Sequence, residues 1–125
     1  MALKLLLLAI AGGLGTLSRY GCGIVVQRFT PDSFPWHTFA VNMVGCFLFG
    51  AFFSVAVEKW GWDGDSRIIV LTGFMGAFTT FSTFAFETAA LFREQQYALA
   101  IVNLAAQNTL GLAALFLGLT VARFV

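Results

Sequence analysis

The chain alternates between long apolar stretches and short polar connections. Apolar residues dominate four segments, which cover roughly residues 3–26, 36–57, 68–92 and 97–122. An α-helix needs about 20 mostly apolar residues to cross the hydrocarbon of a bilayer, and each segment meets that length. Tryptophans stand at or just beyond the edges of the second segment, as expected at a membrane interface. The pattern predicts an all-α membrane protein in which residues 1–125 form a single domain of four transmembrane helices.

Composition agrees with this class. Of the 125 residues, 59% are hydrophobic and 10% are charged, and the mean hydropathy is +0.87. A soluble domain of this length places many more charges on its surface, so we expect an integral membrane protein with almost no extramembrane domain. The formal net charge of +1 gives no support to a nucleic-acid partner.

The amino-terminal segment also has features of a secretory signal. Lys4 precedes a leucine run and the small residues Ala9 and Ala11, which resemble a cleavage site. The apolar character continues past Gly13 to about Val26, which is further than a signal core extends. We therefore predict a retained transmembrane helix.

The third segment departs most from a plain membrane anchor. Its centre, Leu71–Glu87, reads LTGFMGAFTTFSTFAFE and contains Gly73, Gly76 and five hydroxyl side chains. Two glycines loosen a helix, and hydroxyls can satisfy backbone groups freed by a break or donate to a passing ligand. Helix packing explains the same small and hydroxylated residues, so both interpretations stay open here. Phenylalanines recur every third residue along one flank of the helix, at Phe78, Phe81 and Phe84.

Two polar side chains lie well inside the first two segments. Arg19 is costly in the hydrocarbon, so it would snorkel to the interface or face an anion-accessible vestibule. Asn42 carries two amide donors and an acceptor, which are expensive to leave unpaired in lipid. It would therefore join helices by hydrogen bonds or donate to an ion in a pore.

Polar residues continue toward the end of the third segment and into the fourth. Thr80, Thr83 and Glu87 share one helical face, so a hydroxyl stripe would lead to a carboxylate near the membrane edge. That carboxylate fits either a proton relay or a solvated charge at a helix end. Buried amides need partners across the bundle, and the fourth segment adds four polar residues: Asn103, Gln107, Asn108 and Thr109.

Four spans place both chain ends on one side of the membrane. The lysines and arginines divide into Lys4, Lys59, Arg67 and Arg123 on that side, and Arg28 and Arg93 on the other. Because the Lys and Arg bias sets orientation, so weak a bias permits insertion in both directions. Four short helices barely enclose a pathway, so we expect an oligomer with a shared lining, and the hypothesis is an antiparallel pair.

No catalytic set is visible in the sequence, which argues against an enzyme. The single histidine, His37, stands at a segment edge, and the sequence shows no Ser-His-Asp, Cys-His or paired-carboxylate cluster and no metal-ligand spacing. The polar groups inside the segments are mostly donors, which suit an anion, and the positive edges of phenylalanine rings add to them. Glycine breaks also expose backbone carbonyls, which coordinate small cations.

Three motifs resemble the Fluc (CrcB) family of fluoride channels. They are GGLGTLSRY at Gly12–Tyr20, VN at Val41–Asn42 and GFMGAFTTFSTF at Gly73–Phe84. The resemblance covers the whole chain, and the TTFSTF run is its most specific part. It implies an antiparallel, dual-topology homodimer, multi-pass in the bacterial inner membrane, that passively exports fluoride from the cytoplasm and protects the cell from fluoride. It also implies a central sodium ion, held by carbonyls from a broken third helix of both subunits.

The resemblance further implies roles for individual residues. Backbone carbonyls of Gly76 and Thr79 would bind sodium, whereas Asn42 would donate to fluoride beside the ring edges of Phe81 and Phe84. The other residues of the implied fluoride pathway are Thr80, Ser82, Thr83, Glu87, Arg19, Asn108 and Thr109. The sequence leaves open whether the dimer contains one kind of chain or two, whether sodium is structural or regulatory, and how strictly chloride is excluded.

Two other functions are alternatives to a fluoride channel. A small multidrug-type, proton-coupled exporter also has four helices and dual topology, but it relies on an acid in its first helix, where this chain has Arg19 and no acid. A structural subunit of a larger membrane complex would explain the packing glycines but not the TTFSTF run. A growth assay in a sensitive strain separates the three functions. A fluoride channel gives resistance to fluoride, an exporter gives resistance to lipophilic cations, and a structural subunit gives neither.

Overall fold

The computed structural model describes residues 1–124, and every regular element in this range is a helix. The first span is α1 (Ala2–Gln27), and the second is α2 (Trp36–Phe52) with its π-helical continuation η1 (Phe53–Lys59). The third span contains α3 (Gly64–Arg67), the π-helical η2 (Ile68–Met75), α4 (Gly76–Phe78) and α5 (Phe81–Arg93). The fourth is α6 (Tyr97–Val121), which ends in the short 3₁₀ turn η3 (Ala122–Phe124).

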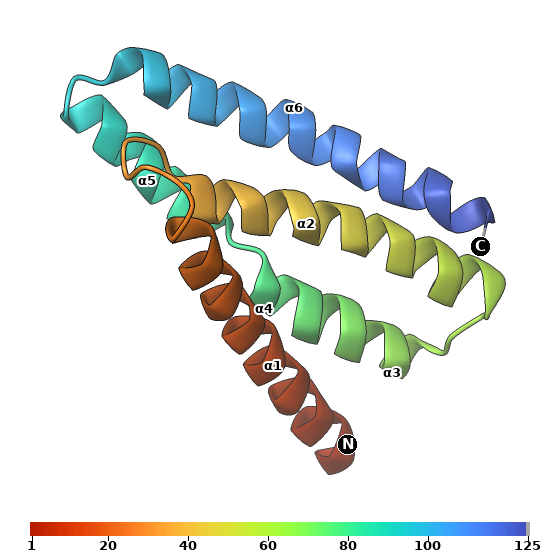
Figure 1. The fold of residues 1–125 in the computed structure, drawn as a ribbon. Helices are drawn as coiled ribbons and strands as arrows, with labels where there is room; N and C mark the ends of the chain where they lie inside the picture. The colour runs from red at the N-terminus through yellow and green to blue at the C-terminus, as the bar shows by residue number, and fades with distance from the viewer. Residues whose placement is uncertain (125) are drawn as a thin grey trace.

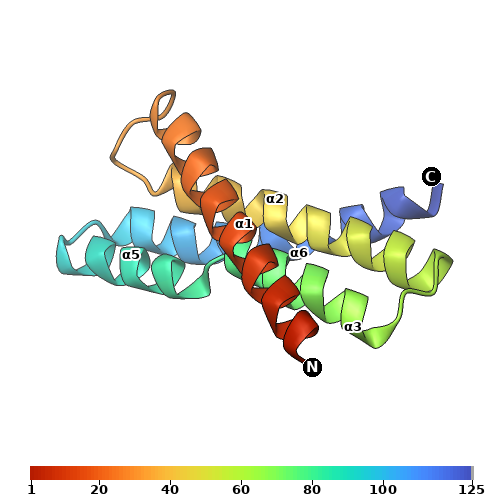
Figure 2. The same cartoon turned by 90° about the horizontal axis from the view of Figure 1, so that it is seen from below.

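Four helical runs are long and apolar enough to cross a membrane, namely Ala2–Gln27, Trp36–Lys59, Gly64–Arg93 and Tyr97–Phe124. They correspond to the four predicted segments, so the prediction of an all-α chain with four helices of membrane-spanning length and hydropathy is confirmed. In Figure 1 the second, third and fourth spans run roughly along one axis, and α1 crosses them obliquely, as Figure 2 also shows. Both marked chain ends lie toward the end of the bundle that holds the 60–63 connection (Figure 1).

Glycines let the spans approach one another at their backbones. A Cβ added at Gly50 of α2 would fall on the carbonyl oxygen of Leu115, and one at Gly118 of α6 would fall on that of Phe47. Gly15 of α1 meets the third span in the same way. In lipid, where burying apolar surface gives no net drive, such close packing holds helices together.

The third span is interrupted after α4. Thr79 has φ −81° and ψ 160°, and Thr80 has φ −150° and ψ 106°, so both residues are extended before the helix resumes at Phe81. Figure 1 shows this extended stretch between α4 and α5. The two glycines predict a loosened helix at their own positions, but Gly76 itself is helical, with φ −63° and ψ −33°. The extended residues are the two threonines that follow.

The third span begins at a capped turn. Asp63 Oδ1 accepts a hydrogen bond from Ser66 N at 2.7 Å, and this bond lowers the pKa of the Asp63 carboxyl. Lys4 Nζ lies 2.6 Å from Asp65 Oδ1, which joins the start of α1 to α3.

The glycine contact between α2 and α6 gives the first prediction. We expect Gly118→Ala to destabilise the fold by about 1–3 kcal/mol, because its methyl group has no room against the Phe47 carbonyl and must push the helices apart. Gly21→Ala is the matched control, since a Cβ there meets nothing within 4 Å. Thermal unfolding of both variants in detergent measures the difference, and equal midpoints would contradict the packing argument.

Candidate functional site

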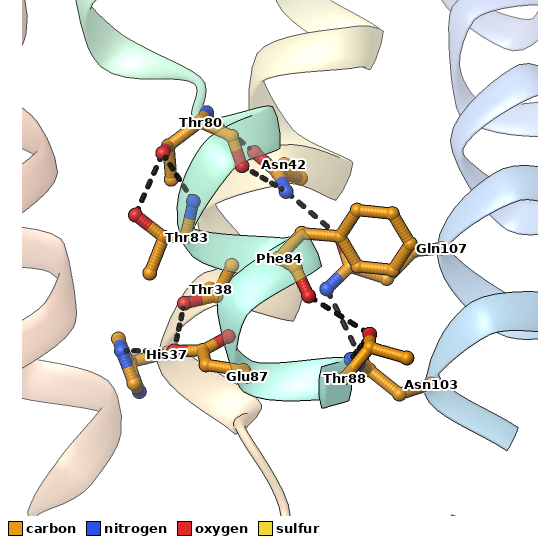
Figure 3. A network of polar contacts seen from close by, with 10 residues as sticks. All are labelled: His37, Thr38, Asn42, Thr80, Thr83, Phe84, Glu87, Thr88, Asn103 and Gln107. Carbon is orange, nitrogen blue, oxygen red and sulfur yellow. Dashed lines mark hydrogen bonds and ion pairs between the residues drawn. The ribbon is translucent and has the colours of Figure 1, made fainter. Parts of the chain in front are cut away.

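Asn42 of α2 holds the interruption of the third span. Its Oδ1 accepts a hydrogen bond from Thr80 N at 2.9 Å, and its Nδ2 donates to Thr80 O at 3.2 Å (Figure 3). The same Nδ2 donates to Gln107 Oε1 of α6 at 2.8 Å. One side-chain amide therefore pairs with both backbone groups of Thr80 and with the fourth span. Asn42, Thr80 and Gln107 are called the clamp below.

A line of polar side chains continues the clamp between α5 and α6. Gln107 Nε2 donates to Asn103 Oδ1 at 3.2 Å, and Asn103 Nδ2 donates to Thr88 Oγ1 at 2.9 Å (Figure 3). Thr88 Oγ1 in turn donates to Phe84 O at 2.8 Å. Asn103 is fully buried, and Gln107 and Thr88 are nearly so. The predicted need of these amides for partners across the bundle is confirmed.

The interruption leaves backbone carbonyls without their helical donors, and Gly76 O and Thr79 O are among them. In a continuous helix, Thr80 N would donate to Gly76 O and Thr83 N to Thr79 O. Here Thr80 N donates to Asn42, and Thr83 N donates to Thr80 Oγ1 at 3.3 Å. Arg19 Nη1 lies 3.4 Å from Thr79 O, and Gly76 is exposed on the surface of the chain. The two carbonyls that the resemblance assigns to sodium thus belong to the first residue of α4 and to the residue that follows its end, and neither has the N–H donor that a continuous helix would supply.

One cavity opens between α1, α2 and the start of α5. It has a volume of about 380 Å³, and its polar lining comes mainly from Arg19, His37, Thr38, Thr80 and Thr83. The hydroxyls of Thr80 and Thr83 lie 2.8 Å apart. Arg19 is therefore aimed at a cavity beside the interruption rather than at the end of its helix. This space is called the vestibule cavity.

A second cavity lies on the other side of the interruption. It has a volume of about 390 Å³ and is lined by Phe81 and Phe84 together with Asn42, Gln107 and Asn108. The two rings meet edge to face, with centroids 5.5 Å apart and planes at 61°. Phe84 is buried, whereas Phe81 is 76% exposed on this chain. This space is called the phenylalanine cavity. Thr80 lines both cavities, so the extended stretch separates them.

Glu87 of α5 faces the start of α2, where its partners Thr38 and His37 lie, rather than Thr80 and Thr83. Its Oε1 accepts a hydrogen bond from Thr38 Oγ1 at 2.7 Å and lies 3.1 Å from His37 Nε2 (Figure 3). Its Oε2 is buried without a hydrogen-bond partner among the described residues. The sequence alone does not indicate this pairing of His37 with Glu87. The available signal was topological, because the second span begins on the side of the membrane where the third one ends.

Some predicted site residues do not join these cavities. Ser82 and Thr109 are both exposed, line neither the vestibule nor the phenylalanine cavity, and Thr109 Oγ1 donates back to Ala105 O of its own helix at 2.8 Å. Asn108 lines the phenylalanine cavity, although its Nδ2 donates to Leu104 O at 2.7 Å. A single chain therefore gathers Asn42, Thr80, Thr83, Phe81, Phe84, Arg19 and Asn108 around two adjoining spaces, while Ser82 and Thr109 point outward.

Known proteins of similar sequence match nearly the whole chain. The family model for CrcB-like protein, Camphor Resistance (CrcB), matches residues 6–119. A protein of Nitrosococcus oceani named "Fluoride-specific ion channel FluC" is 51% identical over 98% of this chain and 98% of its own length. Proteins with the same name from Nitratidesulfovibrio vulgaris and Rhizobium etli are 48% and 37% identical, over 98% and 97% of both chains. By its sequence, then, this four-span chain belongs to the CrcB family.

Proposed function

We propose that this chain forms a fluoride-selective channel that lets fluoride leave the cytoplasm passively across the bacterial inner membrane and so protects the cell. The observation that carries the proposal is the full-length match to relatives named fluoride-specific ion channels. The structure supports it with two adjoining cavities that offer donors and ring edges within a multi-pass helical bundle. A channel needs no catalytic residues.

The lining gives a physical basis for selectivity. Fluoride is a small, hard acceptor that must lose bound water to enter a narrow path. Hydroxyls of Thr80 and Thr83 and the edges of Phe81 and Phe84 could replace that water, because the edges of aromatic rings carry partial positive charge. Chloride is larger and would gain less from the same short contacts. Conduction also requires that no site bind the ion too tightly.

A proton-coupled multidrug-type exporter is the alternative. The first span argues against it, because α1 contains Lys4 and Arg19 but no acidic residue. The relatives named above give it no support, since each carries the fluoride-channel name. A channel therefore fits both the charge of α1 and the family.

The assembly in this proposal is an antiparallel homodimer of dual topology. The near balance of Lys and Arg between the two sides supports insertion in both directions. Phe81 and Gly76, both assigned to ion pathways, are exposed on the single chain. A second copy packed against the face that contains Phe81 and Gly76 would close the phenylalanine cavity. It would also bring its own Gly76 and Thr79 carbonyls next to those of the first copy.

Sodium is the proposed cofactor of the dimer. Gly76 O and Thr79 O fit this role because the interruption removes their helical donors, and carbonyl oxygens suit hard cations. Within residues 1–124, no group of three or more His, Cys, Asp or Glu side chains could hold a metal ion instead. Two carbonyls from each of two chains would give the ion a shared shell at the interface. Bound there, sodium would supply positive charge near the fluoride paths.

The clamp has a supporting part in this proposal. Asn42 satisfies the backbone of Thr80 and so allows the third span to be interrupted inside the membrane. Its amide also borders the phenylalanine cavity, where fluoride would meet the ring edges. Both the shape of the pathway and one of its donors thus depend on the same side chain.

Fluoride efflux from liposomes tests the function directly. We expect rapid, voltage-driven efflux of fluoride but not of chloride when the purified protein is reconstituted and a potassium gradient is applied with valinomycin. Phe81→Ile and Asn42→Asp should lower this flux about tenfold or more while the protein stays folded, since the loss of one contact to a charged group costs about 1.5–3 kcal/mol. Phe86→Ile is the control, because Phe86 is exposed and lines neither the vestibule nor the phenylalanine cavity. Unchanged flux in both test variants would remove these residues from the pathway.

The clamp is tested by stability rather than flux. Asn42→Leu should lower the free energy of unfolding by about 1–3 kcal/mol, because the N–H and C=O of Thr80 then lack partners in a water-poor site. Asn108→Leu serves as the matched control, since Asn108 is exposed and bonds only within its own helix. Thermal unfolding in detergent should separate the two variants, and equal loss of stability would argue against the clamp.

The assembly is tested by labelling and by sodium exchange. In a background with Cys22 and Cys46 replaced by alanine, Trp60→Cys should react with an impermeant thiol reagent from both faces of sealed vesicles, because half of the chains face each way. Replacing sodium by N-methylglucamine should reduce fluoride flux and weaken the dimer on size-exclusion chromatography. Labelling from a single face would exclude dual topology, and flux unaffected by complete sodium removal would exclude a required sodium ion.

A further inference from the structure

His37 stands between the vestibule cavity and a third space near the 28–35 connection. This loop cavity has a volume of about 230 Å³ and extends from the connection to the last turns of α5. His37 and Gln27 line both spaces, whereas Glu87 lines the loop cavity. The side chain of His37 is 35% exposed on the single chain. The imidazole therefore lies at the boundary between the solvent-exposed loop region and the space that holds Arg19.

The two spaces carry opposite charge. Three carboxylates border the loop cavity, from Asp32, Glu87 and Glu94, whereas Arg19 is the charged residue of the vestibule cavity. An anion that approaches from the loop side is repelled before it reaches Arg19. Among the described lining residues, His37 is the side chain that can add positive charge to the loop cavity.

Glu87 depends on His37 for charge compensation. Its Oε1 has two neighbours, the neutral hydroxyl of Thr38 and the imidazole of His37, and its Oε2 lacks a partner among the described residues. A carboxylate in a half-buried site is costly without a nearby positive charge. A protonated imidazole at 3.1 Å makes the pair neutral, whereas a neutral one leaves the full negative charge at the boundary.

We propose that His37 sets the rate of anion entry into the vestibule cavity by its protonation, which cancels the charge of Glu87. The proposal rests on the fluoride-channel function proposed above. It makes His37 a positioning residue for the entering ion and gives this chain a pH-dependent conductance. Imidazole is suited to the task because it changes charge between about pH 5 and 8.

Charged and titratable groups face His37 from three parts of the chain. From α1, Arg19 and Tyr20 border the vestibule cavity. From the 28–35 connection comes Asp32, and from α5 come Glu87 and Glu94. The described part of α6 contributes no titratable residue to either space. Because the Glu87 carboxyl lies against the imidazole, the His37 variants, rather than the pH profile alone, assign a change in conductance to His37.

The test is the pH profile of fluoride efflux from liposomes, with the same pH on both faces and with leak from protein-free liposomes subtracted. For the unaltered chain, efflux should fall about threefold or more as pH rises from about 5.5 to 8, which is the effect of one unit charge near the ion's path in water. His37→Gln should be flat at the slow level and His37→Arg flat at the fast level. Higher ionic strength should shrink the difference, because salt screens the charge of Glu87.

Glu94→Gln is the matched control. It removes a carboxylate from the same cavity but not the partner of His37, so the profile should keep its shape. Efflux that does not change with pH in the unaltered chain would overturn the role of His37, as would a profile that survives His37→Gln. No fluoride efflux at any pH would instead defeat the proposed function, so the two failures are distinguishable.

Discussion

The structure depends on one constraint, which is that a helix interrupted inside a membrane must satisfy the backbone groups it frees. Water is scarce there, and each unpaired N–H or C=O costs several kcal/mol. Asn42 meets the constraint for Thr80 with a single side chain that both donates and accepts. A hydroxyl could not span both groups at once, and a charged side chain would fit only one of them. The amide is therefore what makes the interruption tolerable.

The contact between Asn42 and Thr80 restricts which residues can occupy the neighbouring positions. A Cβ at Gly45 would collide with the Thr79 methyl group, so α2 needs a glycine next to the clamp to come within hydrogen-bond reach of the third span. Gln107 then fixes α6 to Asn42, and the Gly50 and Gly118 contacts carry the same helix pair onward without a gap. Backbone pairing and glycine packing thus reinforce one another.

The sequence predicted the four spans because length and hydropathy decide membrane crossing almost alone. It also predicted that the amides of Asn103 and Gln107 would need hydrogen-bond partners, because both lie inside an apolar helix. Their i, i+4 spacing, which places them on one face, can be read from the sequence. The sequence could not locate the interruption, because Gly76 stays helical and the backbone of the extended Thr80 pairs with Asn42, which is 38 residues away in the sequence. The contact between Thr38 and Glu87 spans 49 residues and leaves no periodic signal. Ser82 and Thr109 share the composition of a polar lining but face outward, because the orientation of each helix is set by packing.

The same hydrogen bonds that stabilise the bundle also limit what it can offer an ion. Asn42 Nδ2 is already engaged by Thr80 O and Gln107 Oε1, so an anion in the phenylalanine cavity must compete for a donor that has other partners. Such competition weakens binding at each site, and weak binding is what rapid passage requires. The hydroxyls of Thr80 and Thr83 are in the same position, since they bond to each other across 2.8 Å. In the proposed channel, selective contact and fast release then come from one cause, because every donor on the path returns to a partner in the protein once the ion has moved on.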